Sequence, residues 1–337
     1  MNKKEIMNER INLNLSDYMS GIIRNLQEAG KYPAVHTYTC TLHSFLNFSG
    51  GRDMPVSMKD VFTPGRLKSY QEWLLGKGLN WNTISTYMRT LRAVYNRLIS
   101  QNPCYVLPIH RLFDCVYTKV ESQTKRALSE RQMRLLLTTD SKNVPEKLQP
   151  AFCYFRLMFL FRGMPFIDLA HLRKCDVHEN VITYCRHKTG KRLTVRIPQE
   201  AKALLKMAID RNPASIYLFP ILDTSQLEGF GLYRCYQHAL HRFNCELEKL
   251  ASLFMSGTKI SSYTARHSWA TLSFHMGIPV GIISEALGHS SVRVTEAYLK
   301  PFENQRVDHA NDKLIDSIIR HEKKSKKYCN RMINRAL

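Results

Sequence analysis

Four side chains that could together bind and cleave a phosphodiester lie between residues 266 and 298. Arg266 is followed at once by His267, and Tyr298 comes nine residues after His289. A tyrosine hydroxyl can form a covalent link to phosphorus. Arginine keeps its charge, and its planar fork donates two hydrogen bonds in a fixed geometry to the extra negative charge of a five-coordinate phosphorane. The stretch therefore predicts transfer of a phosphodiester to Tyr298 without a metal ion.

The same reaction needs two proton transfers. The attacking phenol, with an ordinary pKa of about 10, must lose its proton, and the leaving oxygen must gain one. His289 follows an apolar helical pattern that Gly288 ends, so we expect its ring to project beyond that helix and donate to the phosphate. The sequence contains neither an H-E-x-x-H motif nor a G-x-x-x-x-G-K-[ST] phosphate loop. We therefore expect no cofactor and no metal.

The charge of the chain indicates the partner. Lys and Arg number 49 against 28 Asp and Glu, which gives a formal net charge of +21 over 337 residues. Such an excess favours a polyanion, and nucleic acid is the commonest one. The alternative is a basic surface with no specific partner.

Three segments resemble the C-terminal catalytic signature of tyrosine recombinases, the phage integrase family. They are Ala265–Thr271, Leu287–Ser291 and Tyr298, and the resemblance covers roughly residues 125 to 305. It implies that Tyr298 is the nucleophile and that Arg266 and His289 contact the phosphate. It also implies that a lysine in the turn Lys188-Thr189-Gly190 protonates the leaving oxygen, with Lys191 and Arg192 as rivals to Lys188.

The sequence departs from the family pattern at two positions. The histidine of the family's H-x-x-R element falls at Tyr263, so the proton acceptor for Tyr298 stays open. The first family arginine, which stands three residues before an acidic-Leu pair, falls at Pro165. Arg162 is the nearest substitute, in a turn made by Gly163 and Pro165, and we expect Asp168 to support it as its ion-pair partner.

Hydrophobic periodicity predicts a mainly α fold with a small β-hairpin or sheet, in two domains that clamp duplex DNA. A helical core-binding domain is expected over residues 1–110, a linker over 111–125, a catalytic domain over 126–310 and a basic tail over 311–337. Four apolar stripes mark the helices of the first domain, the third of them ended by Gly76. Arg89, Arg92 and Arg97 fall outside the fourth stripe and could follow DNA.

The predicted second domain contains recognisable local signals. Ser129 suits the start of a helix through Leu137, and residues 151–161 are apolar enough for a buried helix but too short to span a bilayer. Residues 181–184 and 193–197 alternate as two strands of a hairpin around a turn at 188–191.

These features together predict a site-specific DNA recombinase that breaks and rejoins DNA through a 3′-phosphotyrosyl intermediate, for integration, excision or inversion of a mobile element. We expect a homotetramer on paired sites and no membrane association. None of the nine cysteines forms a Cys-x-x-Cys pair, which favours reduced thiols in the cytoplasm. The short stretch before Tyr18 favours a simple recombinase without an arm-binding domain. The alternatives are type IB topoisomerase-like relaxation and a non-catalytic DNA-binding derivative.

Overall fold

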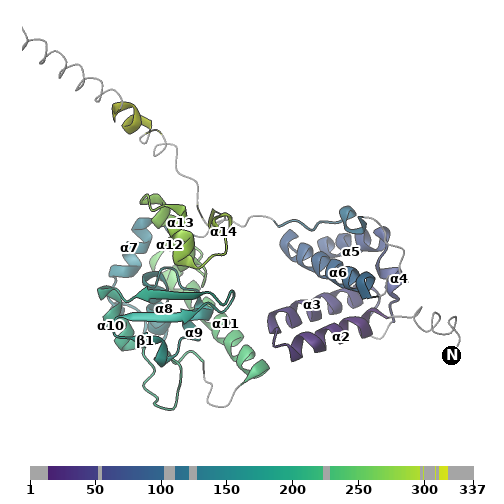
Figure 1. Cartoon of the computed structure of the whole chain (residues 1–337), viewed down its shortest axis with the longest axis horizontal. Helices are drawn as coiled ribbons and strands as arrows, with labels where there is room; N and C mark the ends of the chain where they lie inside the picture. Colours follow the sequence, from purple (N-terminus) through teal and green to yellow (C-terminus); the bar gives the residue numbers. More distant parts are fainter. Residues whose placement is uncertain are drawn as a thin grey trace, which may run out of the picture. The chain divides into compact units, whose positions relative to one another are not determined.

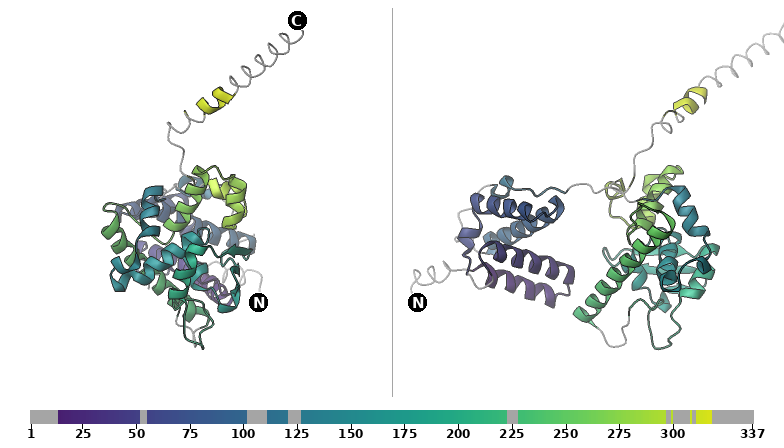
Figure 2. Two further views of the ribbon diagram at one scale, coloured as in Figure 1. Left: turned by 90° about the vertical axis from the view of Figure 1, so that its left-hand side faces the viewer. Right: turned by 180° about the vertical axis from the view of Figure 1, so that it is seen from behind.

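The computed structural model describes residues 14–51, 55–101, 111–120, 127–222, 228–296, 299, 308 and 311–317. The chain divides into two compact units, one of residues 1–123 with 223–237, the other of residues 124–222 with 238–337. The described part is mainly helical with one small antiparallel sheet, which confirms the predicted fold class (Figures 1 and 2). The predicted domain limits themselves stay a prediction.

The first unit is a cluster of helices. The side chains of Asn14 and Thr63 cap two of them by accepting hydrogen bonds from the backbone N–H groups of Ser16 and Arg66. The third apolar stripe was expected to end at Gly76, but its helix includes Gly76 and the chain turns only at Gly78, where φ is 75°. The elements are α2 (Leu15–Glu28), α3 (Tyr32–Phe48), α4 (Met58–Val61), α5 (Pro64–Gly76), α6 (Trp81–Gln101) and the 3₁₀ helix η2 (Leu112–Cys115).

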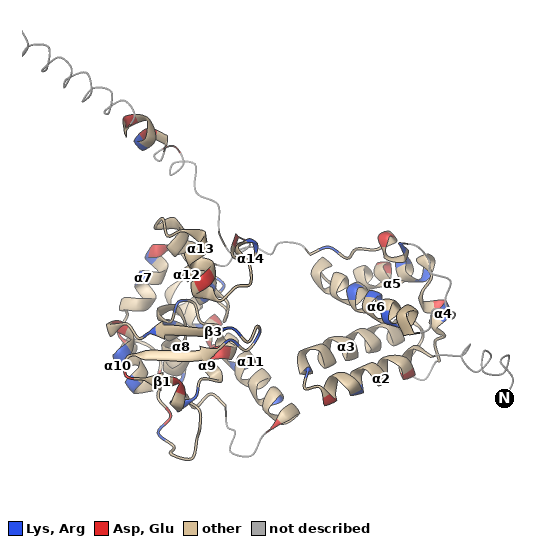
Figure 3. Ribbon diagram, in the orientation of Figure 1, with Lys and Arg blue, Asp and Glu red and all other residues tan. Residues whose placement is uncertain are grey.

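One hydrophobic core holds the first unit together. Leu67, Tyr70 and the apolar stripe of α6 are buried in it. Leu112 and Phe113 of η2 belong to the same core, although we expected residues 111–125 to be a linker. Burial of these two adjacent apolar side chains stabilises the packing of η2 against the core. Arg89, Arg92 and Arg97 lie exposed on α6, a helix on which Figure 3 shows Lys and Arg positions in blue.

The second unit combines helices with the sheet. The 3₁₀ turns η3 (Ser141–Asn143), η4 (Glu146–Leu148) and η5 (Lys174–Asp176) connect longer elements. The helices are α7 (Glu130–Thr138), α8 (Gln149–Leu160), α9 (Phe166–Ala170), α10 (Gln199–Ala208), α11 (Gly229–Phe254), α12 (Thr264–His275), α13 (Val280–Leu287) and α14 (Val292–Glu296). Residues 229–237 of α11 are grouped with the first unit and the rest of this helix with the second. The strands are β1 (Val177–His178), β2 (Val181–Cys185) and β3 (Arg192–Arg196), in the order β1-β2-β3.

The predicted local signals of this unit are confirmed. Ser129 forms a capping box with Gln132 at the start of α7, and α8 is largely buried. β2 and β3 pair antiparallel with Val181 opposite Arg196 and Cys185 opposite Arg192. Among the residues described, no helix is long and apolar enough to cross a membrane.

Candidate active site

Arg266 lies in the core of the second unit, on the first turn of α12, with 2% of its surface exposed. Its Nη1 donates to the carbonyl of Gly163 at 2.9 Å and its Nη2 to the carbonyl of Leu287 at 2.6 Å. A buried guanidinium is tolerated only where acceptors surround it. The two carbonyls come from the turn before α9 and the end of α13, so Arg266 joins three segments of the chain.

His289 lies just beyond α13, as predicted. Gly288 ends that helix in the left-handed conformation with φ 65°. The Nε2 atom of His289 lies 2.9 Å from Nη2 of Arg266, and Nδ1 lies 2.8 Å from the hydroxyl oxygen of Thr295. Because a guanidinium can only donate, Nε2 is the acceptor here and Nδ1 carries the proton toward Thr295. Burial, aided by the charges of Arg266, Arg186 and Lys188, lowers the pKa of His289 to about 4.

A second guanidinium, which the sequence reasoning missed, lies beside Arg266. Arg186 follows β2 directly and is 7% exposed. Its Nη1 donates to the carbonyl of Leu287 at 2.8 Å, the same oxygen that accepts from Arg266. A signal for it was present: Ile182 and Tyr184 are buried, and the two-residue period of a strand puts Arg186 on the same face.

Asp168 pairs with Arg186 and not with Arg162, which corrects our expectation. Its side chain is fully buried, and Oδ2 accepts from Nε of Arg186 at 3.2 Å. Oδ1 accepts from the backbone N–H of His187 at 2.9 Å. Arg162 instead lies at the turn with φ 58° and donates from Nη1 to the carbonyl of Thr194 on β3 at 3.3 Å. Asp168 therefore fixes both Arg186 and the first residue of the hairpin turn.

Lys188 lies exposed in the hairpin turn, one residue after His187. Its charge is among those that lower the pKa of His289. Three positive charges, those of Arg186, Arg266 and Lys188, thus act on the imidazole of His289. The carboxylate of Asp168 neutralises only one of them, that of Arg186. The partial negative charge at the end of α13 offsets only part of this excess. A site of this composition is suited to bind an anion.

Two glycines permit the close packing around the arginines. Gly163 has φ 67°, and a Cβ there would lie 3.0 Å from Cα of Arg266. A Cβ on Gly288 would lie 2.8 Å from Cδ of Arg186 and 2.9 Å from a methyl carbon of Leu193. Both positions combine a left-handed backbone with no room for a side chain, and only glycine satisfies both conditions without strain.

The remaining predicted residues lie around this cluster or outside the described chain. Tyr263 precedes α12, is 51% exposed, and has its ring centroid 6.0 Å from that of His267. Tyr298 lies outside the described residues. Thr295, three residues before it on α14, is fully buried against His289.

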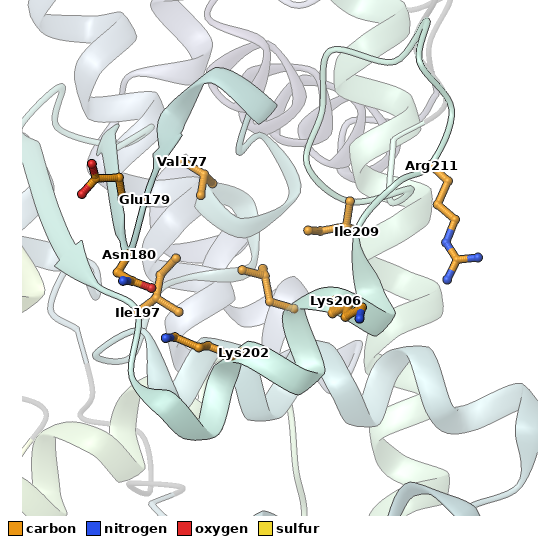
Figure 4. A pocket seen from close by; sticks show the side chains of 9 residues that line it. Val177, Glu179, Asn180, Ile197, Lys202, Lys206, Ile209 and Arg211 are labelled. Carbon is orange, nitrogen blue, oxygen red and sulfur yellow. The ribbon is translucent and has the colours of Figure 1, made fainter.

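Two hollows of the second unit lie on other residues. One of about 440 Å³ is lined by the apolar side chains of Val177, Ile197 and Ile209 and by basic side chains that include Lys202 and Lys206 (Figure 4). Another of about 700 Å³ is lined by α7, the end of α8 and the end of α12. Neither contains Arg186, Arg266 or His289.

Comparison with protein families decides how this cluster is interpreted. The family model described as "Phage integrase family" matches residues 126–305, and the "Phage integrase SAM-like domain" model matches residues 14–104. The chain belongs to the phage integrase family. The resemblance seen in the sequence is thereby confirmed, and Arg186, Arg266 and His289 all fall within the matched region of this integrase-family chain.

Individual relatives of this integrase-family chain are distant but cover most of it. A tyrosine recombinase of Thermosipho africanus is 22% identical over 297 residues, which is 87% of this chain and 95% of the relative. The Tn1549 transposon integrase, solved with a circular intermediate DNA, has a TM-score of 0.61 at 15% identity and covers 89% of this chain and 99% of that one. The XerH recombinase bound to a palindromic difH substrate has a TM-score of 0.59 at 19% identity, covering 82% of this chain and 79% of that one.

Proposed function

We propose that this protein is a site-specific DNA recombinase that breaks and rejoins duplex DNA through a 3′-phosphotyrosyl intermediate on Tyr298. The observation that carries the proposal is the pair of buried guanidinium groups, Arg186 and Arg266, beside His289 in a phage integrase family chain. In this cluster two buried cations, Arg186 and Arg266, outnumber the buried carboxylate of Asp168, as stabilisation of a phosphorane requires. The formal charge of +21 supports duplex DNA as the substrate.

The proposed roles follow from chemistry and position. Tyr298 attacks phosphorus and the 5′-oxygen leaves, so the energy of the broken bond stays in the protein–DNA link and rejoining needs no ATP. Arg266 binds a non-bridging oxygen. The negative charge of the phosphate raises the pKa of His289, whose Nε2 takes up a proton from solvent and then donates a hydrogen bond to the phosphate. Lys188 gives a proton to the leaving oxygen. Tyr263, which is half exposed, is the proposed donor in place of the family histidine. Arg162, the first arginine that the sequence alone offered, is given no role here because the supporting carboxylate of Asp168 pairs with Arg186.

The same proposal includes the number of protein copies, the kind of DNA that is moved and the cellular compartment. Exchange between two DNA sites requires four cleavages, so we propose four copies of the chain on paired sites. The similar solved structures include a transposon integrase, which supports a mobile element as the DNA that is moved. A duplex DNA substrate and the free thiols of the cysteines that the structure describes support action in the cytoplasm. Integration, excision and inversion are all compatible with this chemistry.

Covalent trapping tests the proposal. Nicked duplexes drawn from the DNA on either side of the gene would be incubated with the protein, and complexes that survive denaturant would be isolated and sequenced. We expect a protein–DNA adduct at a short repeated site, unaffected by excess EDTA, and no adduct from Tyr298→Phe, which should still bind DNA. Cleavage that EDTA abolishes and magnesium restores would indicate a metal nuclease instead.

A non-catalytic DNA-binding derivative is the second candidate, and Pro165 and Tyr263 favour it because each replaces a family residue. Such a derivative would bind the same DNA with high salt sensitivity yet form no adduct. A type IB topoisomerase would form the adduct and relax a plasmid that carries one site. A recombinase converts a plasmid with two sites into recombinant product.

A further inference from the structure

Arg266 has few hydrogen-bond donors left for a phosphate. Its Nη1 is used by the carbonyl of Gly163, and its Nη2 by the carbonyl of Leu287 and by His289. The transition state of phosphodiester cleavage places charge on two non-bridging oxygens. One guanidinium with its donors largely committed stabilises that charge poorly, so a second cation is needed at the same place.

We propose that Arg186 is this second cation, that it binds the scissile phosphate beside Arg266, and that Asp168 is the positioning residue that aims it. The inference rests on the proposed recombinase function and assigns one of its phosphate-binding groups. It gives the role to a residue at the end of β2, in place of Arg162 in the turn before α9.

Two hydrogen-bond distances place the guanidinium groups of Arg186 and Arg266 beside the same carbonyl oxygen. Arg266 Nη2 and Arg186 Nη1 lie 2.6 and 2.8 Å from the carbonyl oxygen of Leu287, so the two nitrogens are no more than 5.4 Å apart. Charge-assisted hydrogen bonds of about 2.7–2.9 Å allow two oxygens of one phosphate to reach both groups. Leu287 is the last residue of α13, and this carbonyl is one that a helix end leaves without an intrahelical partner.

Arg186 is held in place while part of its fork stays available. Asp168 accepts from Nε, and the carbonyls of Leu287 and Gly288 accept from Nη1 at 2.8 and 3.5 Å. Within the described part of the chain, no hydrogen bond uses its Nη2. A side chain fixed at Nε and Nη1 presents Nη2 without loss of further rotamer freedom, which is the preorganisation that transition-state binding requires.

Arg162 lacks this support. Its hydrogen bond runs to the carbonyl of Thr194 on β3, and the buried carboxylate of Asp168 is already occupied by Arg186 and His187. Arg162 is half buried and forms no ion pair with any residue that the structure describes, so its side chain is less restricted in direction than that of Arg186. Arg162 is therefore the matched control for Arg186.

The test compares two DNA substrates that differ only at the scissile phosphate. In one it is an ordinary phosphodiester, and in the other a methyl group replaces a charged oxygen to give an uncharged methylphosphonate. An arginine that stabilises the lost negative charge becomes dispensable on the second substrate, whereas an arginine that only supports the fold does not. Each variant's rate of adduct formation is divided by that of the unmodified protein on the same substrate.

We expect Arg186→Ala to slow adduct formation roughly 100-fold or more on the phosphodiester and only a few-fold on the methylphosphonate. Arg162→Ala should lose little on either. Arg186→Lys, which keeps a charge but not the fork, should be slowed on the phosphodiester by an intermediate factor and serves if Arg186→Ala does not fold. Asp168→Asn should also lose more of its rate on the phosphodiester than on the methylphosphonate, but by a smaller factor than Arg186→Ala.

Equal losses of Arg186→Ala and Arg186→Lys on both substrates would show a structural role alone and overturn the inference. Selective rescue of Arg162→Ala by the methylphosphonate would give the role to Arg162. Either result requires that the unmodified protein forms the adduct. Failure of the unmodified protein to form any adduct would instead reject the recombinase function itself.

Discussion

The hydroxyl oxygen of Thr295 lies 2.8 Å from Nδ1 of His289, and Thr295 has no exposed surface. Thr295 belongs to α14, three residues before the proposed nucleophile, so this contact joins the segment of Tyr298 to the imidazole. Because Arg266 donates to Nε2, the proton of the neutral ring is held at Nδ1 by Thr295. The contact with Thr295 therefore occupies Nδ1 and leaves Nε2 as the ring nitrogen that can turn from Arg266 to a bound phosphate.

Thr295→Val should slow adduct formation about tenfold, since it removes one acceptor while it keeps the shape of the side chain, and a hydrogen bond contributes about 1–1.5 kcal/mol. Thr295→Ser, which keeps the hydroxyl, should lose much less. The rates are measured with the nicked duplex. Nitrogen chemical shifts of His289 should report the proton at Nδ1 in both proteins, because Arg266 still donates to Nε2 in Thr295→Val. Adduct formation by Thr295→Val at the rate of the unmodified protein would contradict this role.

The sequence predicted the elements and one half of the site. Periodicity and capping residues located the hairpin, α7 and α13, because these signals act over neighbouring residues. Arg266 and His289 were found because their spacing matches a family signature. The ion-pair partner of Asp168 was predicted wrongly: Arg162 is closer in sequence, whereas the observed partner, Arg186, is 18 residues away. Sequence proximity says little about which of two arginines reaches a buried carboxylate.

Lys188→Ala should slow cleavage of an ordinary phosphodiester roughly 100-fold or more, because a positioned general acid contributes about 10²–10⁴-fold. When sulfur replaces the 5′-bridging oxygen, the leaving thiolate needs no proton, and Lys188→Ala should then react at nearly the rate of the unmodified protein. Lys191→Ala is the control in the same turn and should lose little on either substrate. A variant at Lys191 that alone is rescued by sulfur would move the acid to that residue.

Gly288→Ala should destabilise the protein by at least 1–2 kcal/mol, the cost of a left-handed backbone for a residue with a Cβ. The new methyl group would also lie 2.8 Å from Cδ of Arg186 and push this side chain from Leu287. Gly281→Ala in the same helix is the matched control: its Cβ meets nothing within 4 Å, and it should be neutral or slightly stabilising. Denaturant unfolding at neutral pH measures both. Equal stability of the two variants would show that the close packing at Gly288 carries no cost.

His289 should make the stability of the DNA-free protein depend on pH in a defined window. Burial and the cations of Arg266, Arg186 and Lys188 lower the pKa of this ring from its ordinary value to about 4. Between about pH 6.5 and pH 4 the unfolded chain therefore binds a proton here that the folded protein does not. The free energy of unfolding must then fall as the pH falls through this window, and the stability that the neutral His289 contributes is fully present only above the window.

His289→Gln, which keeps an acceptor for Arg266 and cannot titrate, should show a weaker loss of stability between neutral pH and pH 4. Urea unfolding at closely spaced pH values measures the difference, and identical pH profiles for the two proteins would contradict the low pKa. A bound phosphate should reverse the effect of the cations, so the same ring should titrate at a higher pH in the DNA complex.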